Sequence, residues 1–227
     1  MGEFIKQALI LCGGKGERLQ PITDLRPKPL VKIDNEPILS YQIKYLEKSG
    51  IKDFLIATGY KSRLIEDYLK QSFNKLNITI IDSGIVDIML RIHDCKNYLN
   101  DEFLVCYGDT LADIDISKLY KFHKKHNGKA TVSTYQLQSQ FGIIKNDRSG
   151  LVKEFLEKPK LDAWINIGYF IFNKTVINND AINFVDFISH LVQSEYLYSY
   201  KHKGLHITVN TLIELKQAEI DINNFNY

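Results

Sequence analysis

Short apolar runs alternate with helical patterns through the first half of the chain, and this alternation limits the fold more than any other feature. Four runs are typical of buried strands: Ala8–Cys12, Phe54–Thr58, Ile78–Ile81 and Phe103–Tyr107. Between them, apolar residues recur at helical spacing over 38–49, where Gly50 suits the helix end, and over 64–69. Strand, helix and strand in this order predict right-handed βαβ units and a parallel sheet, whose carboxyl edge commonly binds a ligand.

The second half of the chain continues this pattern less regularly. Thr211 is suited to cap a last helix that reaches Ala218. Neither a repeat nor a linker divides the 227 residues. The prediction is one α/β domain over 1–227, Rossmann-like, with a mixed, mainly parallel sheet flanked by helices. Its further strands are expected at 130–136, 143–145, 152–155 and 165–172, and its further helices at 119–125 and 184–192.

The charge balance and the cysteines narrow the class of protein. Lysine plus arginine (29) against aspartate plus glutamate (27) leaves a net charge of +2, which argues against a nucleic-acid-binding surface. Cys12, Cys95 and Cys106 have no metal-ligand or redox spacing, so we expect reduced thiols in a cytoplasmic protein. Glu3 and Lys6 interrupt any secretion signal, and no apolar stretch approaches the ~18 residues of a membrane span. We therefore expect neither a nucleic acid nor a membrane as a partner.

The most specific local signal follows the first expected strand, in LILCGGKGERLQP at 9–21. A glycine-rich loop after a strand exposes N–H groups that can hold phosphate oxygens. It is not a Walker A loop, because Gly16 precedes Glu-Arg rather than Lys-Ser or Lys-Thr, nor a dinucleotide fingerprint, because Leu19 stands where a third glycine is needed. Arg18 and Lys28, the latter between two prolines, add two cations. The loop and the cations together suit a triphosphate.

These stretches resemble the start of the nucleotidylyltransferases that activate sugar 1-phosphates. The resemblance runs in order through LCGGKGERL, RPKPLVKIDNEPIL, ATGYKS, DSG, YGD, FGII, FLEKPK and WINIGYFIFN, and in detail it is most similar to the glucose-1-phosphate cytidylyltransferases. It implies a nucleotide-diphospho-sugar transferase-like fold, with nucleotide bound by about residues 1–115 and acceptor by about 116–227. The implied reaction is Mg²⁺-dependent transfer of CMP from CTP, or of another nucleotide from its triphosphate, to a small phosphorylated acceptor with release of pyrophosphate.

The resemblance also implies roles for individual residues. The implied nucleotide-binding residues are Leu11, Cys12, Gly13, Gly14, Gly16, Arg18, Lys28, Ser83, Gly84 and Gly108. The implied catalytic residues are Arg18, Lys28 and Asp109, and the implied Mg²⁺ ligands are Asp109 and Asn210. The implied acceptor-binding residues are Gly142, Glu157, Lys158, Asn166 and Gly168. Ser83 and Gly84 also suit a plain turn, and Gly168 also suits a crowded position in a strand.

Three positions depart from the family pattern. Asn210 stands where a carboxylate usually ligates the metal, so it is either a weaker metal ligand or a cap of the last helix. Gln140 replaces an expected arginine. Ile167 replaces an expected glycine, and we expect its larger side chain to narrow the acceptor pocket.

These departures favour an acceptor other than glucose 1-phosphate. The hypothesis is phosphoglutamine, which gives CDP-glutamine for capsular phosphoramidate synthesis. Two alternatives stay open: a cytidylyl- or guanylyltransferase for glucose or heptose 1-phosphate, and an inactive relative that binds nucleotide for regulation. An inactive pocket has no need of four charged residues at once: Arg18, Lys28, Asp109 and Lys158. The sequence leaves a homo-oligomer open, because three tyrosines suit either a strand with one aromatic face or an interface: Tyr196, Tyr198 and Tyr200.

Overall fold

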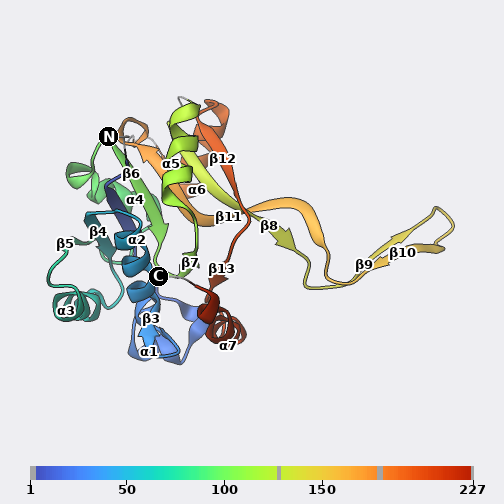
Figure 1. Ribbon diagram of the computed structural model, residues 1–227, viewed down its shortest axis with the longest axis horizontal. Coiled ribbons are helices and arrows are strands. Elements are labelled where there is room, and N and C mark those ends of the chain that lie inside the picture. The colour runs from blue at the N-terminus through green and yellow to red at the C-terminus, as the bar shows by residue number, and fades with distance from the viewer. Residues whose placement is uncertain (1–3, 127–128, 178–180, 226–227) are drawn as a thin grey trace.

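A seven-stranded sheet forms the centre of the computed structural model, which describes residues 4–126, 129–177 and 181–225 (Figure 1). The strand order is β12-β8-β11-β6-β1-β4-β5. Within this sheet β11 alone runs antiparallel to its neighbours, so the predicted mixed, mainly parallel sheet is confirmed. The strands are β1 (Gln7–Leu11), β4 (Asp53–Thr58), β5 (Asn77–Asp82), β6 (Glu102–Tyr107), β8 (Ala130–Gln138), β11 (Lys160–Asn173) and β12 (Leu197–His202).

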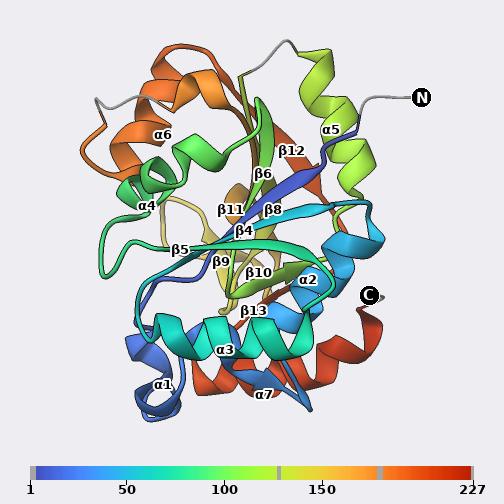
Figure 2. The same cartoon turned by 90° about the vertical axis from the view of Figure 1, so that its left-hand side faces the viewer.

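Helices cover both faces of the sheet (Figure 2). Ala8 and Ile10 of β1 face one apolar cluster, and Leu9 between them faces another, because side chains alternate along a strand. The first cluster lies under α2 (Ile38–Lys48), α3 (Ser62–Ser72) and α5 (Ile116–Lys125), and the second under α4 (Ile88–Asp94) and α6 (Phe184–Gln193). None of the described helices combines the length and the apolar composition needed to cross a membrane.

A third apolar cluster lies beside the carboxyl edge of the sheet, under α7 (Leu212–Asp221). It joins α7 to β7 (Thr110–Ala112) and to β13 (His206–Thr208), which pairs with β7. Thr211 caps α7, as predicted, and Glu214 completes a capping box. The pairing of β13 with β7 places the residues that follow β13 beside the end of β6. The remaining short elements are α1 (Ile22–Leu25), β2 (Lys32–Ile33), β3 (Glu36–Pro37) and the 3₁₀ turns Glu17–Leu19, Lys28–Leu30, Lys96–Tyr98, Lys174–Val176 and Ile222–Asn224.

A two-stranded ribbon projects from the body of the molecule (Figure 1). It consists of β9 (Ile143–Asn146) and β10 (Val152–Leu156), which pair with each other in a separate sheet. The prediction that 143–145 and 152–155 join the main sheet is therefore wrong. We call residues 139–159 the arm. Its large apolar side chains are exposed: Phe141 (78%), Ile144 (57%), Leu151 (59%), Val152 (54%) and Phe155 (61%).

The three cysteines are buried and free. Burial raises the pKa of the Cys12 thiol far above its usual value and that of Cys95 to about 12. Burial also raises the pKa of Cys106. All three therefore stay protonated and pack as small apolar groups.

Candidate active site

The glycine loop leaves the carboxyl end of β1 and closes against the segment that carries Lys28. Gly16 has the left-handed φ of 68°, and its carbonyl accepts a hydrogen bond from Thr23 Oγ1 at 3.0 Å. A Cβ at Gly16 would lie 3.0 Å from Thr23 Cγ2 and 3.1 Å from Lys28 Cβ. A side chain at position 16 would thus push Lys28 away from the loop. Lys28 itself is only 8% exposed and begins a 3₁₀ turn after Pro27.

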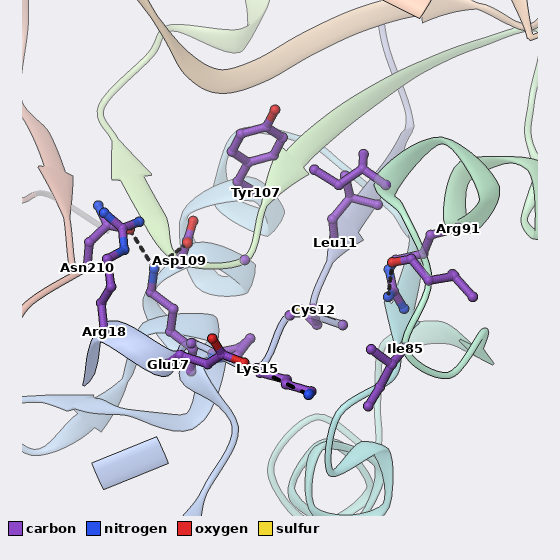
Figure 3. Close-up of a pocket in the computed structure, with 18 residues that line it drawn as sticks. Leu11, Cys12, Lys15, Glu17, Arg18, Ile85, Arg91, Tyr107, Asp109 and Asn210 are labelled. Carbon is purple, nitrogen blue, oxygen red and sulfur yellow. Dashed lines mark hydrogen bonds and ion pairs between the residues drawn. The ribbon is translucent and has the colours of Figure 1, made fainter. Parts of the chain in front are cut away.

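Four side chains converge beside this loop, and we call Arg18, Lys28, Asp109 and Asn210 the cation cluster (Figure 3). Lys28 Nζ lies 2.5 Å from Asp109 Oδ2 and donates to Asn210 Oδ1 at 2.8 Å. Arg18 Nη2 donates to the same Asn210 oxygen at 3.0 Å. Asp109 follows β6 and Asn210 follows β13, so the pairing of β13 with β7 brings these distant residues together.

Arg91 of α4 lies on the opposite side of the same loop and was not predicted as a site residue (Figure 3). Its side chain is 3% exposed and donates to the carbonyl oxygens of Thr58, Gly84 (3.0 Å) and Val86 (3.2 Å). A Cβ at Gly13 would meet the guanidinium at 1.9 Å. Arg91 therefore joins the loops that follow β1, β4 and β5. The available signal was one arginine inside the apolar run IVDIMLRI, 85–92.

The loop, the cation cluster and Arg91 enclose a cavity of about 710 Å³ at the carboxyl edge of the sheet (Figure 3). Arg18, Lys28, Asp109 and Asn210 lie at one end, and Arg91 lies at the other together with apolar side chains such as Leu11 and Ile85 (Figure 3). A volume of this size suits a ligand as large as a nucleotide. The lining residues are Leu11, Cys12, Gly13, Gly14, Lys15, Gly16, Glu17, Arg18, Lys28, Pro29, Ile85, Val86, Ile88, Arg91, Tyr107, Gly108, Asp109 and Asn210.

Most of the predicted nucleotide-binding residues line this cavity, but Ser83 and Gly84 do not. These two form a turn after β5, in which Gly84 has a φ of 69° and its N–H donates to Asp82 Oδ1. Their neighbours Ile85 and Val86 line the cavity instead. Gly108 is required by close packing, because a Cβ there would lie 2.7 Å from Cys12 Sγ.

The predicted acceptor-binding residues lie outside the cavity and form two groups. Asn166 and Gly168 lie next to Tyr107, which does line the cavity. Asn166 Nδ2 is 3.5 Å from the Tyr107 hydroxyl, and Asn166 Oδ1 accepts from Gly168 N–H at 2.8 Å. Burial raises the pKa of Tyr107, so its hydroxyl stays neutral.

The second group lies on the arm. A Cβ at Gly142 would lie 2.7 Å from the ring of Phe155 and 3.2 Å from the Glu157 carboxylate. Gln138 donates to the carbonyl oxygen of Lys158, whose side chain is exposed. Gln138 lies four residues along β8 from Thr134, the residue that pairs with Asn166, which is a distance of about 13 Å. The roles of Gly142, Glu157 and Lys158 stay predictions.

The structure corrects the expectation for Ile167. Its side chain is 3% exposed and belongs to the apolar cluster under α2, α3 and α5. The prediction that Ile167 narrows the acceptor pocket is therefore wrong, because strand alternation turns this residue into the core. Gly168 has a φ of 76°, and a Cβ there would lie 2.5 Å from the Tyr107 ring. The alternative reading of Gly168, as relief of crowding, agrees with this packing.

Two carboxylates line the cavity, Asp109 in the cation cluster and Glu17 on the glycine loop. Within the described ranges, no group of three or more His, Cys, Asp or Glu side chains is placed to hold a metal ion. Asp109 lines the cavity and fits the chemistry of Mg²⁺, which takes one or two protein carboxylates together with phosphate oxygens. The side chain of Asn210 does not cap α7, because Thr211 occupies that position.

An α/β fold with a glycine loop and converging cations at the carboxyl edge of its sheet defines a class of protein that binds a polyphosphate. The pattern of the nucleotidyl transferase family matches residues 7–220, so the chain belongs to this family and is a nucleotidyltransferase. The assignment agrees with the resemblance found in the sequence.

Individual proteins support the same assignment. The chain is 35% identical over 236 residues to a glucose-1-phosphate cytidylyltransferase of Salmonella typhimurium, covering 91% of each chain. It is 31% identical to a probable glucose-1-phosphate cytidylyltransferase of Bacillus subtilis, covering 93% of this chain and 94% of the relative. A crystal structure of a putative glucose-1-phosphate thymidylyltransferase from Bacillus anthracis has the same fold, with a TM-score of 0.79 at 20% identity and coverage of 98% and 97%.

Proposed function

We propose that the enzyme transfers CMP from CTP to a small phosphorylated acceptor and releases pyrophosphate. The observation that carries this proposal is a single cavity with the cation cluster at one end and the apolar side chains Leu11 and Ile85, beside Arg91, at the other (Figure 3). Arg18 and Lys28 suit the triphosphate, and the apolar side chains Leu11, Ile85 and Val86 suit a base. The two relatives at 31–35% identity are named as cytidylyltransferases, which supports CTP as the nucleotide.

The residues of the cavity suit in-line attack on the α-phosphorus. N–H groups of the glycine loop and the two cations would hold the triphosphate and neutralise the charge that develops on the leaving pyrophosphate. Asp109 would hold Mg²⁺, which when bound neutralises phosphate charge and orients the triphosphate. The acceptor phosphate supplies the attacking oxygen. The protein positions and stabilises the reactants, and the reaction requires no covalent enzyme intermediate.

For the acceptor we propose phosphoglutamine, which gives CDP-glutamine for modification of a surface polysaccharide. The support is the departure at Gln140, an exposed residue of the arm where the family pattern has an arginine. An amide replaces a fixed positive charge there, which suits an acceptor that is not a hexose phosphate. A second candidate acceptor is glucose 1-phosphate, and the names of the relatives favour it.

A pyrophosphate-release assay with CTP and a panel of phosphorylated acceptors separates these candidates. We expect phosphoglutamine to give a kcat/KM at least tenfold above that of glucose 1-phosphate or heptose 1-phosphate. The reverse order would reject phosphoglutamine and keep the cytidylyltransferase assignment. Release with GTP but not with CTP would reject cytidine. The variant Gln140→Arg is the matched test of the acceptor argument, and it should shift the ratio of kcat/KM toward the hexose phosphate.

A further inference from the structure

Two hydrogen bonds hold Asn210 to neighbouring residues of the chain. Its backbone N–H donates to Glu214 Oε2 at 2.6 Å, and its Nδ2 donates to Thr208 Oγ1 at 2.9 Å. The bond to Thr208 fixes the orientation of the amide, because only Nδ2 can donate to that hydroxyl while the oxygen faces the cations. Asn210 Oδ1 therefore points into the cavity in a fixed position.

That oxygen already has two partners, and both are cations. Lys28 Nζ lies at 2.8 Å and Arg18 Nη2 at 3.0 Å. An amide oxygen has two lone pairs, so these two bonds use its acceptor capacity. A metal ion on this oxygen would have to displace one of the cations and would lie beside the other. Asp109, by contrast, keeps Oδ1 available, with a single 3.2 Å contact from the neighbouring Thr110 hydroxyl.

We propose that Asn210 is a positioning residue that holds the Arg18 guanidinium and the Lys28 ammonium together for the polyphosphate, and that it is not a ligand of the metal ion. This inference rests on the proposed function only for the presence of a polyphosphate in the cavity. It replaces the sequence-based assignment of Asn210 as a metal ligand by a role that its four hydrogen bonds support.

The charge of the cluster explains what an amide does at this position. Arg18, Lys28 and Asp109 together carry a formal charge of +1, from two cations and one carboxylate, and neutral Asn210 leaves this charge in place. A carboxylate at position 210 would reduce it to zero. The amide thus orders two cations without neutralising either, which strengthens the attraction for a polyphosphate even before a metal ion binds.

The test measures polyphosphate binding without any metal. Isothermal titration with inorganic tripolyphosphate, and separately with CTP, is done in EDTA on the wild type, Asn210→Ala and Thr208→Val. We expect about tenfold weaker binding for Asn210→Ala, because two charge-assisted hydrogen bonds that order the cations are lost. Thr208→Val should weaken binding about threefold, because it frees the amide without touching the cations. Asn223→Ala, an exposed substitution of the same type, should leave binding unchanged.

A second readout separates positioning from ligation of the metal. At saturating CTP, the Mg²⁺ concentration for half-maximal turnover of Asn210→Ala should stay within twofold of the wild type. Polyphosphate binding in EDTA that is unchanged in Asn210→Ala, or a half-maximal Mg²⁺ concentration raised tenfold, would overturn the proposal. If Asn210→Ala does not fold, Thr208→Val decides through its binding in EDTA alone. Lack of turnover by the wild type would reject the proposed function. The role of Asn210 would still be tested by tripolyphosphate binding, which needs no turnover.

Discussion

Replacement of Arg91 by methionine should destabilise the fold, because this side chain bonds backbone carbonyls of two separate segments. Methionine keeps the apolar stem of the side chain and removes its donors to three carbonyl oxygens. Hydrogen bonds from a charged donor contribute about 1.5–3 kcal/mol each. The carbonyls of Gly84 and Val86 are partly buried beside the cavity, so water replaces much of what they lose. Most of the destabilisation should come from the Thr58 carbonyl, because its bond to Arg91 is buried and water cannot replace it. We expect the free energy of unfolding to fall by about 2–4 kcal/mol.

Urea unfolding followed by circular dichroism measures this loss. Against a typical total stability of about 5–15 kcal/mol, the shift in midpoint would be large. Arg63→Met is the matched control, because Arg63 is exposed on α3, and it should stay within about 0.5 kcal/mol of the wild type. We also expect Arg91→Met to weaken CTP binding, since the loops after β1 and β5 lose their common partner. A loss below about 1 kcal/mol would refute the role given to these hydrogen bonds.

Three further predictions test other parts of the structure. Gly168→Ala should cost about 2–4 kcal/mol in urea unfolding, from the left-handed φ and the clash with Tyr107, whereas Gly150→Ala, with a φ of 89° and open space, should cost about 1 kcal/mol. Burial, and to a smaller extent the nearby His202, lowers the pKa of His206 to about 4. The unfolded chain therefore takes up a proton at His206 near pH 6.5, whereas the folded chain takes it up only near pH 4. Stability should therefore fall between about pH 6.5 and 4 by at most ~3 kcal/mol, and His206→Gln should flatten that fall in unfolding midpoints. Asp109→Ala should lower Mg²⁺-dependent turnover about 10²–10³-fold, and near-normal turnover would mean that the metal is held elsewhere.

Sequence reasoning reached the charged end of the cavity because local patterns define it. The apolar runs predict parallel strands, and the carboxyl ends of such strands gather at one edge. Arg18, Lys28, Asp109 and Asn210 each follow or lie near such an end, and the structure brings all four together. Their catalytic and metal-binding roles stay predictions.

The pairing of the arm strands and the direction of the Ile167 side chain depend on contacts between strands that are distant in the sequence. A local sequence pattern does not reveal such contacts. Residues 143–146 and 152–156 have the same strand pattern whether they extend the main sheet or pair only with each other. Ile167 turns into the core on the same side of β11 as Tyr169 and Ile171, and which side of the strand faces the core follows from how β11 pairs between β6 and β8.

Arg91 was missed for a different reason. The run 85–92 has two β-branched residues at its start and a helix of seven residues, which is too short for a helical period to stand out. A lone arginine in an apolar run is also compatible with an exposed position. Its partners are backbone carbonyls at the end of β4 and on the loop after β5, so the sequence offers no oppositely charged side chain to reveal the contact.

The most direct test of the central claim is ³¹P NMR of the products formed from CTP, Mg²⁺ and phosphoglutamine. We predict equal amounts of pyrophosphate and of a product in which a new P–O–P bond joins the α-phosphorus to the acceptor phosphate, because the bond that breaks lies between the α- and β-phosphates. Both products should be reduced at least 10²-fold with Asp109→Ala. Orthophosphate with CDP would place the cleavage between the β- and γ-phosphates and contradict the account. So would unchanged CTP with phosphoglutamine and with every sugar 1-phosphate.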